Sequence, residues 1–404
     1  MKNRFLFPCL MILVLVVTAC APAAATTAAP AGATQPPAAS KEPIKIGALH
    51  NMTGNEGPLD GPASQGAKLA VKQINDSGGL LGRPVELVLM DTKTDIATAG
   101  NAATQLANAK VVAVEGYADT DYALTTGPIL AKAGIPYVTA GATSPKLPAV
   151  VPDWLFMANW GDNTQAAAMA EYAYNKLSLK TAFLMNNAGK EVSYLVTDYF
   201  TKRFEELGGK VVHTENYQTG DRDYSAEITK FKAISPAPDL IYVGTSPDDI
   251  GTIIKQFRES GVDAWIMSND GADTPLLLQV AGQSATKVLY TTHAFFEENT
   301  GTDAVKKFMA DYKAAYGNIP ENAFVGLAYD ATNLIFDAIK RAGSTDSAKI
   351  KDALAATKGF QAVTGTISYD PPSRIPNKDV FIIGTKDGKF VLVETLVPQK
   401  VPAP

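Results

Sequence analysis

The chain has 404 residues, with 36 Lys and Arg against 41 Asp and Glu, which gives a formal net charge of −5 at pH 7. A mildly acidic chain whose basic residues are scattered lacks the basic patch of nucleic-acid-binding proteins, so we expect no nucleic acid partner. The length exceeds one ordinary hydrophobic core and predicts two domains or more.

The amino terminus has the layout of an export signal. Lys2 and Arg4 supply positive charge, and the apolar run at 5–17 is shorter than the about 20 apolar residues that span a bilayer. The end of the stretch "LVVTAC" resembles the bacterial lipoprotein signal, in which segment 1–19 is removed and Cys20 carries lipid. The alternative is an ordinary cleaved signal that leaves Cys20 as a free thiol.

Residues 20–42 contain mainly Ala, Pro, Thr and Gly without periodicity, which is typical of a flexible tether. The only other cysteine, Cys9, lies inside the predicted signal, so the processed chain cannot form an internal disulfide. We therefore expect a lipid-anchored protein of the cell envelope that works outside the cytoplasm, in the periplasm or on an outer face.

From residue 44 onward, short apolar runs alternate with amphipathic segments. The first series predicts strands at 44–49, 85–91, 111–116 and 135–140, with helices at 66–79, 98–109 and 123–133. A second series predicts strands at 181–186, 210–215, 240–245, 264–269 and 287–292, with helices at 164–177, 192–207, 225–234 and 249–260. Helices at 303–316, 323–342 and 347–356 and β segments at 364–370, 380–385 and 390–396 follow. The sequence therefore predicts an α/β fold of two similar lobes, each with a parallel sheet between helices.

Signals for catalysis and metal binding are weak. The three histidines, His50, His213 and His293, are not spaced as a metal-binding pair, and two of them fit the core or rim of a sheet. Neither a nucleophile elbow nor a phosphate-binding loop occurs in the sequence. We therefore predict no enzyme, no cofactor and no metal site.

The segments just after predicted strands carry polar side chains, and in open α/β sheets ligands bind there. In "AGATSPKL" (140–147), Gly141 allows close backbone approach, and backbone N–H groups with the Thr143 and Ser144 hydroxyls suit a carboxylate. In "SNDGAD" (268–273), Asp270 offers a carboxylate to a cation. A zwitterion between the two lobes would use both, although either segment alone fits a simple turn.

Long stretches of the chain resemble the leucine/isoleucine/valine-binding family of periplasmic binding proteins. They include "IKIGALHNMTGNEGPLDGPASQGAKLAVKQINDSGG" from 44, "AGIPYVTAGATSPKL" from 133, "NAFVGLAYDATNLIFDAI" from 322 and "GTISYD" from 365. The resemblance implies two lobes joined by three crossover strands, with crossings near 160, 293 and 364. It places the first lobe at 43–160 and 294–364, the second at 161–293 and 365–397, and a tail at 398–404.

The resemblance also implies a set of ligand-binding residues. They fall on Leu59, Thr120, Gly141, Ala142, Thr143, Ala188, Ser246 and Asp270, with carboxylate contacts on the first lobe and Asp270 as the ammonium-binding acid. Family members for aliphatic amino acids often place tyrosines where this chain has Leu59, Ala188 and Ser246. Tyr117, Tyr122 or Trp160 would be the alternative source of aromatic surface, unless they have a structural role. Asp119 and Asp121 fit solvated positions of a loop, and otherwise would favour a more polar or cationic ligand.

The function implied is capture of a small amino acid, of the branched-chain type or related, and delivery to the permease of an ATP-binding-cassette importer. Membrane attachment would come from the lipid on Cys20. Two alternatives stay open: a binding protein for urea, short amides or aromatic acids, and a module that senses a ligand for a signalling partner.

Overall fold

The computed structural model describes residues 42–298 and 300–404. The predicted signal at 1–19, the lipidated Cys20 and the tether up to residue 41 lie outside the described residues. None of the helices within the described ranges is long and apolar enough to cross a membrane.

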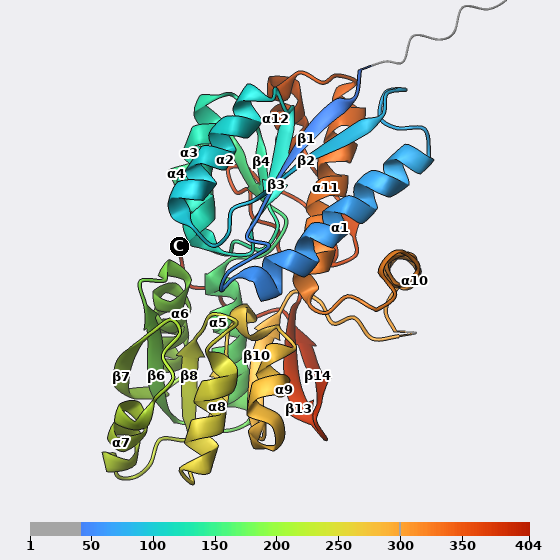
Figure 1. The fold of residues 1–404 in the computed structure, drawn as a ribbon. Helices are drawn as coiled ribbons and strands as arrows, with labels where there is room; N and C mark the ends of the chain where they lie inside the picture. Colours follow the sequence, from blue (N-terminus) through green and yellow to red (C-terminus); the bar gives the residue numbers. More distant parts are fainter. Residues whose placement is uncertain (1–41, 299) are drawn as a thin grey trace, which may run out of the picture. The chain divides into compact units, whose positions relative to one another are not determined.

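The first lobe is built on a parallel five-stranded sheet in the order β2-β1-β3-β4-β5 (Figure 1). Its strands are β1 (Ile44–His50), β2 (Val85–Asp91), β3 (Ala113–Gly116), β4 (Tyr137–Thr139) and β5 (Leu155–Met157). The first four confirm the predicted strands. β5 was not predicted because a three-residue strand is too short to show a period.

Helices cover both faces of this sheet, because its strands bury side chains in both directions. Ile44, Ile46 and Val138 point into one core and Leu49 and Val114 into the other. The first face carries α1 (Gly57–Asp76), α11 (Ala323–Ala342) and α12 (Ser347–Ala355). The second carries α2 (Ile96–Asn108), α3 (Thr120–Lys132) and the short α4 (Leu147–Val150).

Helix α1 begins nine residues earlier than the predicted start at 66. Pro58 stands at the beginning of the helix, where a missing N–H costs little, and Leu59 and Ala63 extend the buried face. Further along, α1 and α11 approach closely, because a Cβ built on Gly66 would lie 2.0 Å from the Val325 carbonyl oxygen. The contact that fixes α11 against α1 therefore depends on the absence of a side chain at residue 66.

The second lobe contains a seven-stranded sheet in the order β14-β13-β10-β9-β8-β6-β7. Its strands are β6 (Thr181–Ala188), β7 (Lys210–Gln218), β8 (Leu240–Gly244), β9 (Trp265–Ser268), β10 (Val288–Thr292), β13 (Val380–Lys386) and β14 (Lys389–Leu396). The first five are parallel and have the same relative order as the five strands of the first lobe, whereas β13 and β14 are antiparallel. The predicted two-lobed α/β fold is confirmed.

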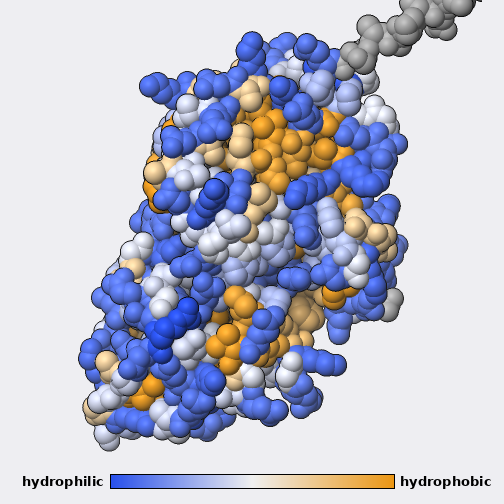
Figure 2. All heavy atoms as spheres, viewed as in Figure 1, coloured by the Kyte–Doolittle hydropathy of each residue, from blue (hydrophilic) through white to orange (hydrophobic). Residues whose placement is uncertain are grey.

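Helices also cover both faces of the second sheet (Figure 1). One core contains α7 (Ser225–Ala233), α8 (Ile250–Glu259) and α9 (Leu276–Ala281). The other contains α6 (Glu191–Glu206) and α5 (Asp162–Glu171), which continues as a π-helical turn over Tyr172–Lys176. Figure 2 shows a mainly hydrophilic surface on the displayed face, with hydrophobic side chains gathered in a few patches.

Three segments connect the lobes, after β5, after β10 and before β13. α10 (Asp303–Tyr316) follows the second and packs beside α1 and α11. The third connecting segment leaves the first lobe later than the predicted crossing near 364. Ile367 and Tyr369 are still buried in the core of the first lobe, and the Tyr369 hydroxyl donates to the Met157 carbonyl at 2.9 Å. The hairpin of β11 (Phe360–Ala362) and β12 (Gly365–Ile367) precedes it.

The last residues pack on the second lobe. The backbone N–H groups of Gln399 and Lys400 donate to the Glu171 carboxylate at 2.8 and 3.2 Å, and the Asn163 amide donates to the Pro402 carbonyl at 2.8 Å. The segment 398–404 that the sequence predicts as a tail therefore has fixed contacts with α5.

Candidate functional site

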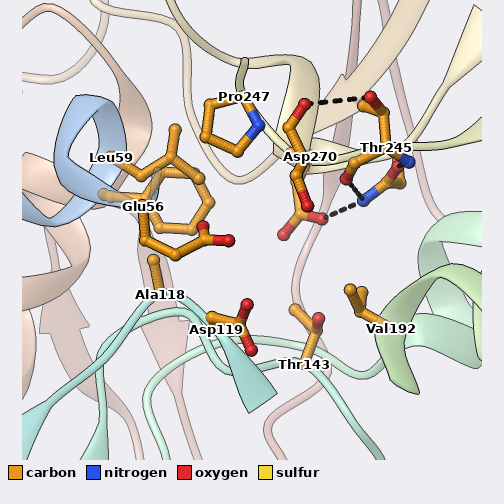
Figure 3. Close-up of a pocket in the computed structure, with 13 residues that line it drawn as sticks. Glu56, Leu59, Ala118, Asp119, Thr143, Val192, Thr245, Pro247 and Asp270 are labelled. Atoms are coloured by element: carbon orange, nitrogen blue, oxygen red, sulfur yellow. Dashed lines mark hydrogen bonds between the residues drawn. The ribbon is translucent and has the colours of Figure 1, made fainter. Parts of the chain in front are cut away.

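A pocket lies where the carboxyl ends of strands from both sheets meet (Figure 3). In each lobe the strand order reverses beside the first strand, and an α/β sheet binds ligands at this switch point. Its walls come from the segments after β1, β3, β4, β6, β8 and β9, and from the start of α11. The lining residues are Glu56, Leu59, Ala118, Asp119, Thr143, Val192, Thr245, Ser246, Pro247, Asn269, Asp270, Gly271 and Phe324.

Half of the predicted site residues line this pocket: Leu59, Thr143, Ser246 and Asp270. Thr143 and Asp270 come from different lobes and lie on opposite sides of the space in Figure 3. Ala188 is not among the lining residues and ends strand β6 in register with Gln218. Val192, four residues later at the start of α6, forms that part of the wall instead.

The other three predicted residues form the support beneath the first-lobe wall. The Gly141 N–H donates to the Asn159 side chain at 3.1 Å, and the Ala142 N–H donates to the Tyr117 carbonyl at 3.0 Å. The Thr120 hydroxyl accepts from the Ser144 N–H at 3.1 Å. The expectation that the loop at 140–147 presents free N–H groups is therefore wrong at these positions, because bonds within the lobe already use them.

Backbone conformation and packing explain why residue 141 is a glycine. Its φ is +136°, a conformation that side-chain-bearing residues rarely adopt, and a Cβ would lie 2.5 Å from the Phe324 ring. Phe324 itself lines the pocket. The glycine therefore lets α11 of the first lobe place an aromatic ring at the base of the site.

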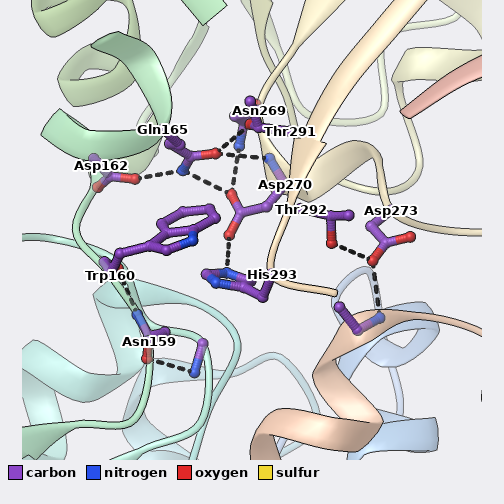
Figure 4. A network of polar contacts seen from close by, with 12 residues as sticks. Asn159, Trp160, Asp162, Gln165, Asn269, Asp270, Asp273, Thr291, Thr292 and His293 are labelled. Atoms are coloured by element: carbon purple, nitrogen blue, oxygen red, sulfur yellow. Dashed lines mark hydrogen bonds and ion pairs between the residues drawn. The ribbon is translucent and has the colours of Figure 1, made fainter. Parts of the chain in front are cut away.

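Asp270 is held by a hydrogen-bond network (Figure 4). Its Oδ1 accepts from Gln165 Nε2 and its Oδ2 from His293 Nε2, each at 2.9 Å, while the Asp270 N–H donates to Gln165 Oε1 at 3.1 Å. Gln165 also accepts from the Thr291 hydroxyl at 2.7 Å. A carboxylate has about four acceptor positions, so these bonds fix the orientation of Asp270 and leave capacity for a ligand donor.

Two neighbours complete the electrostatics of Asp270. Burial lowers the pKa of His293 although Asp270 opposes the shift, so His293 is a neutral donor. Burial and the Asp270 charge raise the pKa of Asp162 well above its usual range, and Asp162 Oδ1 accepts from Gln165 at 2.9 Å. Burial and the neighbouring Asp270 therefore disfavour a negative charge on Asp162.

The aromatic residues that the sequence offered as ligand surface have structural contacts. Trp160 stacks on the His293 ring with centroids 3.7 Å apart, and its indole N–H donates to the Asp379 carbonyl at 3.1 Å. Tyr117 is fully buried in the first lobe beside Tyr122. None of the three, Tyr117, Tyr122 or Trp160, is among the residues that line the pocket.

A buried charge cluster supports the Ala118 part of the wall. His50 lies between Asp60 and Glu115, with its Nδ1 and Nε2 each 3.1 Å from a carboxylate oxygen. Burial opposes protonation of His50, but Glu115 and Asp60 outweigh it and raise the pKa of His50 to about 10. Asp60 also accepts from the Ala118 N–H at 2.9 Å, which links the imidazolium to the pocket wall.

Sequence reasoning missed Glu56, Val192 and Phe324, and also the supporting pair Gln165 and His293. The rule that ligands meet the ends of strands could have found Glu56 and Val192, which follow β1 and β6. Phe324 had no local signal, because it comes from a helix far along the chain that joins the first lobe only through tertiary packing.

A ligand pocket between two lobes of matching strand order, at the carboxyl edges of both sheets, defines a solute-binding protein of the two-lobed α/β class. The chain belongs to the periplasmic binding protein family, whose model matches residues 43–389. The family relationship predicted from the sequence is confirmed.

Individual relatives are also similar over most of the chain. The chain is 29% identical over 352 residues to the Leu/Ile/Val-binding protein homolog 3 of Brucella melitensis, which covers 87% of this chain and 94% of that protein. The structure of the leucine-binding protein LivK from Thermotoga maritima has 31% identity and a TM-score of 0.82, over 88% of this chain and 99% of that one. LivJ from Streptococcus pneumoniae, solved in complex with isoleucine, has 30% identity and the same TM-score, over 88% of this chain and all of that one.

Proposed function

We propose that this chain captures a small amino acid of the branched-chain type in the pocket between its lobes and delivers it to the permease of an ATP-binding-cassette importer. The relatives that bind leucine or isoleucine support the ligand class. The observation that carries the proposal is the placement of Thr143 and Asp270, from different lobes, on opposite sides of one pocket. A ligand that carries both a carboxylate and an ammonium would connect the two lobes.

In this proposal each side of the pocket has a chemical role. The Thr143 hydroxyl serves the polar head of the ligand from the first lobe, and Asp270 accepts from the ammonium. Leu59, Val192, Pro247 and Phe324 supply apolar surface for an aliphatic side chain. Among the described residues that line the pocket, no nucleophile is paired with a base, and in this proposal the ligand is released unaltered.

The membrane anchor and the location belong to the same proposal. Cys20 would carry lipid and hold the protein on the outer side of a membrane, with residues 20–42 as the tether. The name of the family supports an extracytoplasmic location, and the lipid rests on the four residues that end at Cys20.

The test compares leucine with 4-methylpentanoate, which has the same carbon skeleton but no ammonium. Thermal shift and calorimetry on the purified protein should show binding of leucine and a strong preference for it over the analogue. A ligand at 100 times its dissociation constant adds about 2.7 kcal/mol of stability, which moves the melting temperature visibly. In Asp270→Asn, leucine affinity should fall about a hundredfold, since the ammonium loses its charged partner.

The control variant is Asp263→Asn, whose parent carboxylate is largely exposed and pairs with Lys287 on the surface. It should bind leucine as the unmodified protein does. Retention of the preference for leucine over the analogue in Asp270→Asn would refute the ammonium contact. Stabilisation by urea, short amides or aromatic acids, with none by any amino acid, would keep the family and refute the ligand class.

A further inference from the structure

Lys190 crosses from the second lobe to two acids of the first. It stands between β6 and α6, and its Nζ lies 2.8 Å from Glu56 Oε1 and 2.7 Å from Asp119 Oδ2. Glu56 follows β1 and Asp119 follows β3, and both carboxyls line the pocket. The same lysine is therefore shared by two lining acids that come from separate loops of the opposite lobe.

This cluster is shielded from water. The side chain of Lys190 is 12% exposed, and those of Glu56 and Asp119 are 3% and 5% exposed. Burial raises the pKa of Glu56 to about 8, although Lys190 opposes the shift. Two carboxyls so close together in a buried place need a cation, because buried like charges repel and are poorly solvated.

Among the described residues that line the pocket, acids are the only charged groups, and Lys190, which is not a lining residue, binds two of them. Asp270, the third lining acid, has Gln165 and His293 as partners and takes no part in this cluster. The pocket therefore has two acidic sites. Asp270 has neutral partners and remains available to a ligand cation, whereas Glu56 and Asp119 already bind a cation that the protein supplies, the Lys190 ammonium.

We propose that Lys190 determines the specificity of the pocket by occupying, with its own ammonium, a place that would otherwise accept a cationic ligand side chain. The inference rests on the proposed function, because it concerns the side-chain half of the same amino-acid site. With Lys190 present, a ligand such as lysine brings a second ammonium against the first. Asp119 also accepts from the Asp121 N–H at 2.8 Å, but without Lys190 neither Glu56 nor Asp119 has an internal cation, so the two acids pair with a cationic side chain.

The experiment measures the affinities of leucine and lysine by calorimetry for the unmodified protein and for Lys190→Met, which keeps the length of the side chain and removes its charge. The ratio of the lysine to the leucine dissociation constant should fall by about tenfold or more in Lys190→Met, since the Lys190 ammonium no longer repels the ammonium of the ligand side chain. Lysine should also bind Lys190→Met more tightly than it binds the unmodified protein. An unchanged ratio overturns the inference.

Two further variants make the result specific. Lys202→Met removes an exposed lysine of α6 whose ion pair is with Asp198 on the same helix, and it should leave the ratio unchanged. The triple change Lys190→Met, Glu56→Gln and Asp119→Asn should lose the gain in lysine affinity, and persistence of the gain there overturns the inference. Circular dichroism spectra and melting temperatures confirm that each variant is folded.

Failure of the proposed function has a different signature. If the unmodified protein binds no aliphatic amino acid, the ligand class is wrong, and the inference is then judged on lysine alone. Tighter lysine binding by Lys190→Met, abolished in the triple variant, still supports it. Equal lysine binding by the unmodified protein and Lys190→Met contradicts it.

Discussion

The buried His50 cluster gives a sharp test of the electrostatics beneath the pocket. His50, Asp60 and Glu115 are each 0% exposed, and the imidazolium is within 3.1 Å of both carboxylates. In His50→Gln the two carboxyls lose their cation, and Glu115 Oε2 has no hydrogen-bond partner even in the unmodified protein. Breaking a buried charge pair costs about 3–5 kcal/mol of unfolding free energy, and Gln recovers part of it as a donor, so we expect a loss of about 3 kcal/mol at pH 7.

The pH dependence has a defined sign. The pKa of His50 in the folded protein, about 10, lies above the ordinary histidine value of 6.5. The stabilisation from the charged imidazole is therefore fully present below pH 6.5 and is lost as the pH rises through about 10. We expect urea unfolding at pH values from 6 to 10 to show that the difference in unfolding free energy between the unmodified protein and His50→Gln narrows as the pH rises.

His213→Gln is the matched control. His213 pairs with Glu215, but its side chain is 38% exposed, so its replacement should cost about 0–1 kcal/mol. The reasoning would be refuted if His50→Gln lowered the unfolding free energy as little as His213→Gln does. It would also be refuted if the difference in unfolding free energy between the unmodified protein and His50→Gln stayed constant up to pH 10. Because Asp60 also binds the Ala118 N–H, leucine affinity should fall in His50→Gln and not in His213→Gln.

Two more predictions concern packing and anchoring. Gly66→Ala should lower the unfolding free energy by about 1–3 kcal/mol in urea titrations, because the new methyl group meets the backbone of α11. The control Gly100→Ala in α2, where no atom lies nearer than 3.7 Å to the new methyl group, should raise the unfolding free energy by up to about 1 kcal/mol. Equal effects of the two substitutions would contradict the close contact between α1 and α11. Cys20→Ser should move the expressed full-length protein from the membrane fraction to the soluble fraction, because each buried methylene of a lipid chain contributes about 0.8 kcal/mol; unchanged membrane association would contradict the lipid on Cys20.

Much of the fold could be predicted because the local signals agree with the tertiary structure. Ile44 and Ile46 alternate with residues of the opposite face, and the helices of both lobes show their apolar spacing in the sequence. The start of α1 was predicted too late because Pro58 and Pro62 read locally as breakers, while burial of Leu59 in the tertiary structure compensates. The third crossing was placed too early because only tertiary contact shows that Tyr369 packs in the first lobe.

The site was predictable in its outline and less so in its details. Thr143 and Asp270 follow strands, and the rule of strand ends finds such residues. Whether Gly141 and Ala142 have free N–H groups depends on Asn159 and Tyr117, whose partners cannot be read from local sequence. The pairing of Lys190 with two acids distant in sequence likewise requires the two lobes to be placed together.

The stack of Trp160 on His293 has a consequence for how this protein can be modified. Trp160 and His293 stand in two of the segments that connect the lobes, Trp160 binds Asp379 in the third, and His293 donates to Asp270. In the proposed binding mode, the contacts between the connecting segments and the contact of Asp270 with the ligand ammonium thus belong to one network. We therefore expect substitutions of Trp160 or His293 to change the affinity for the solute although neither residue lines the pocket.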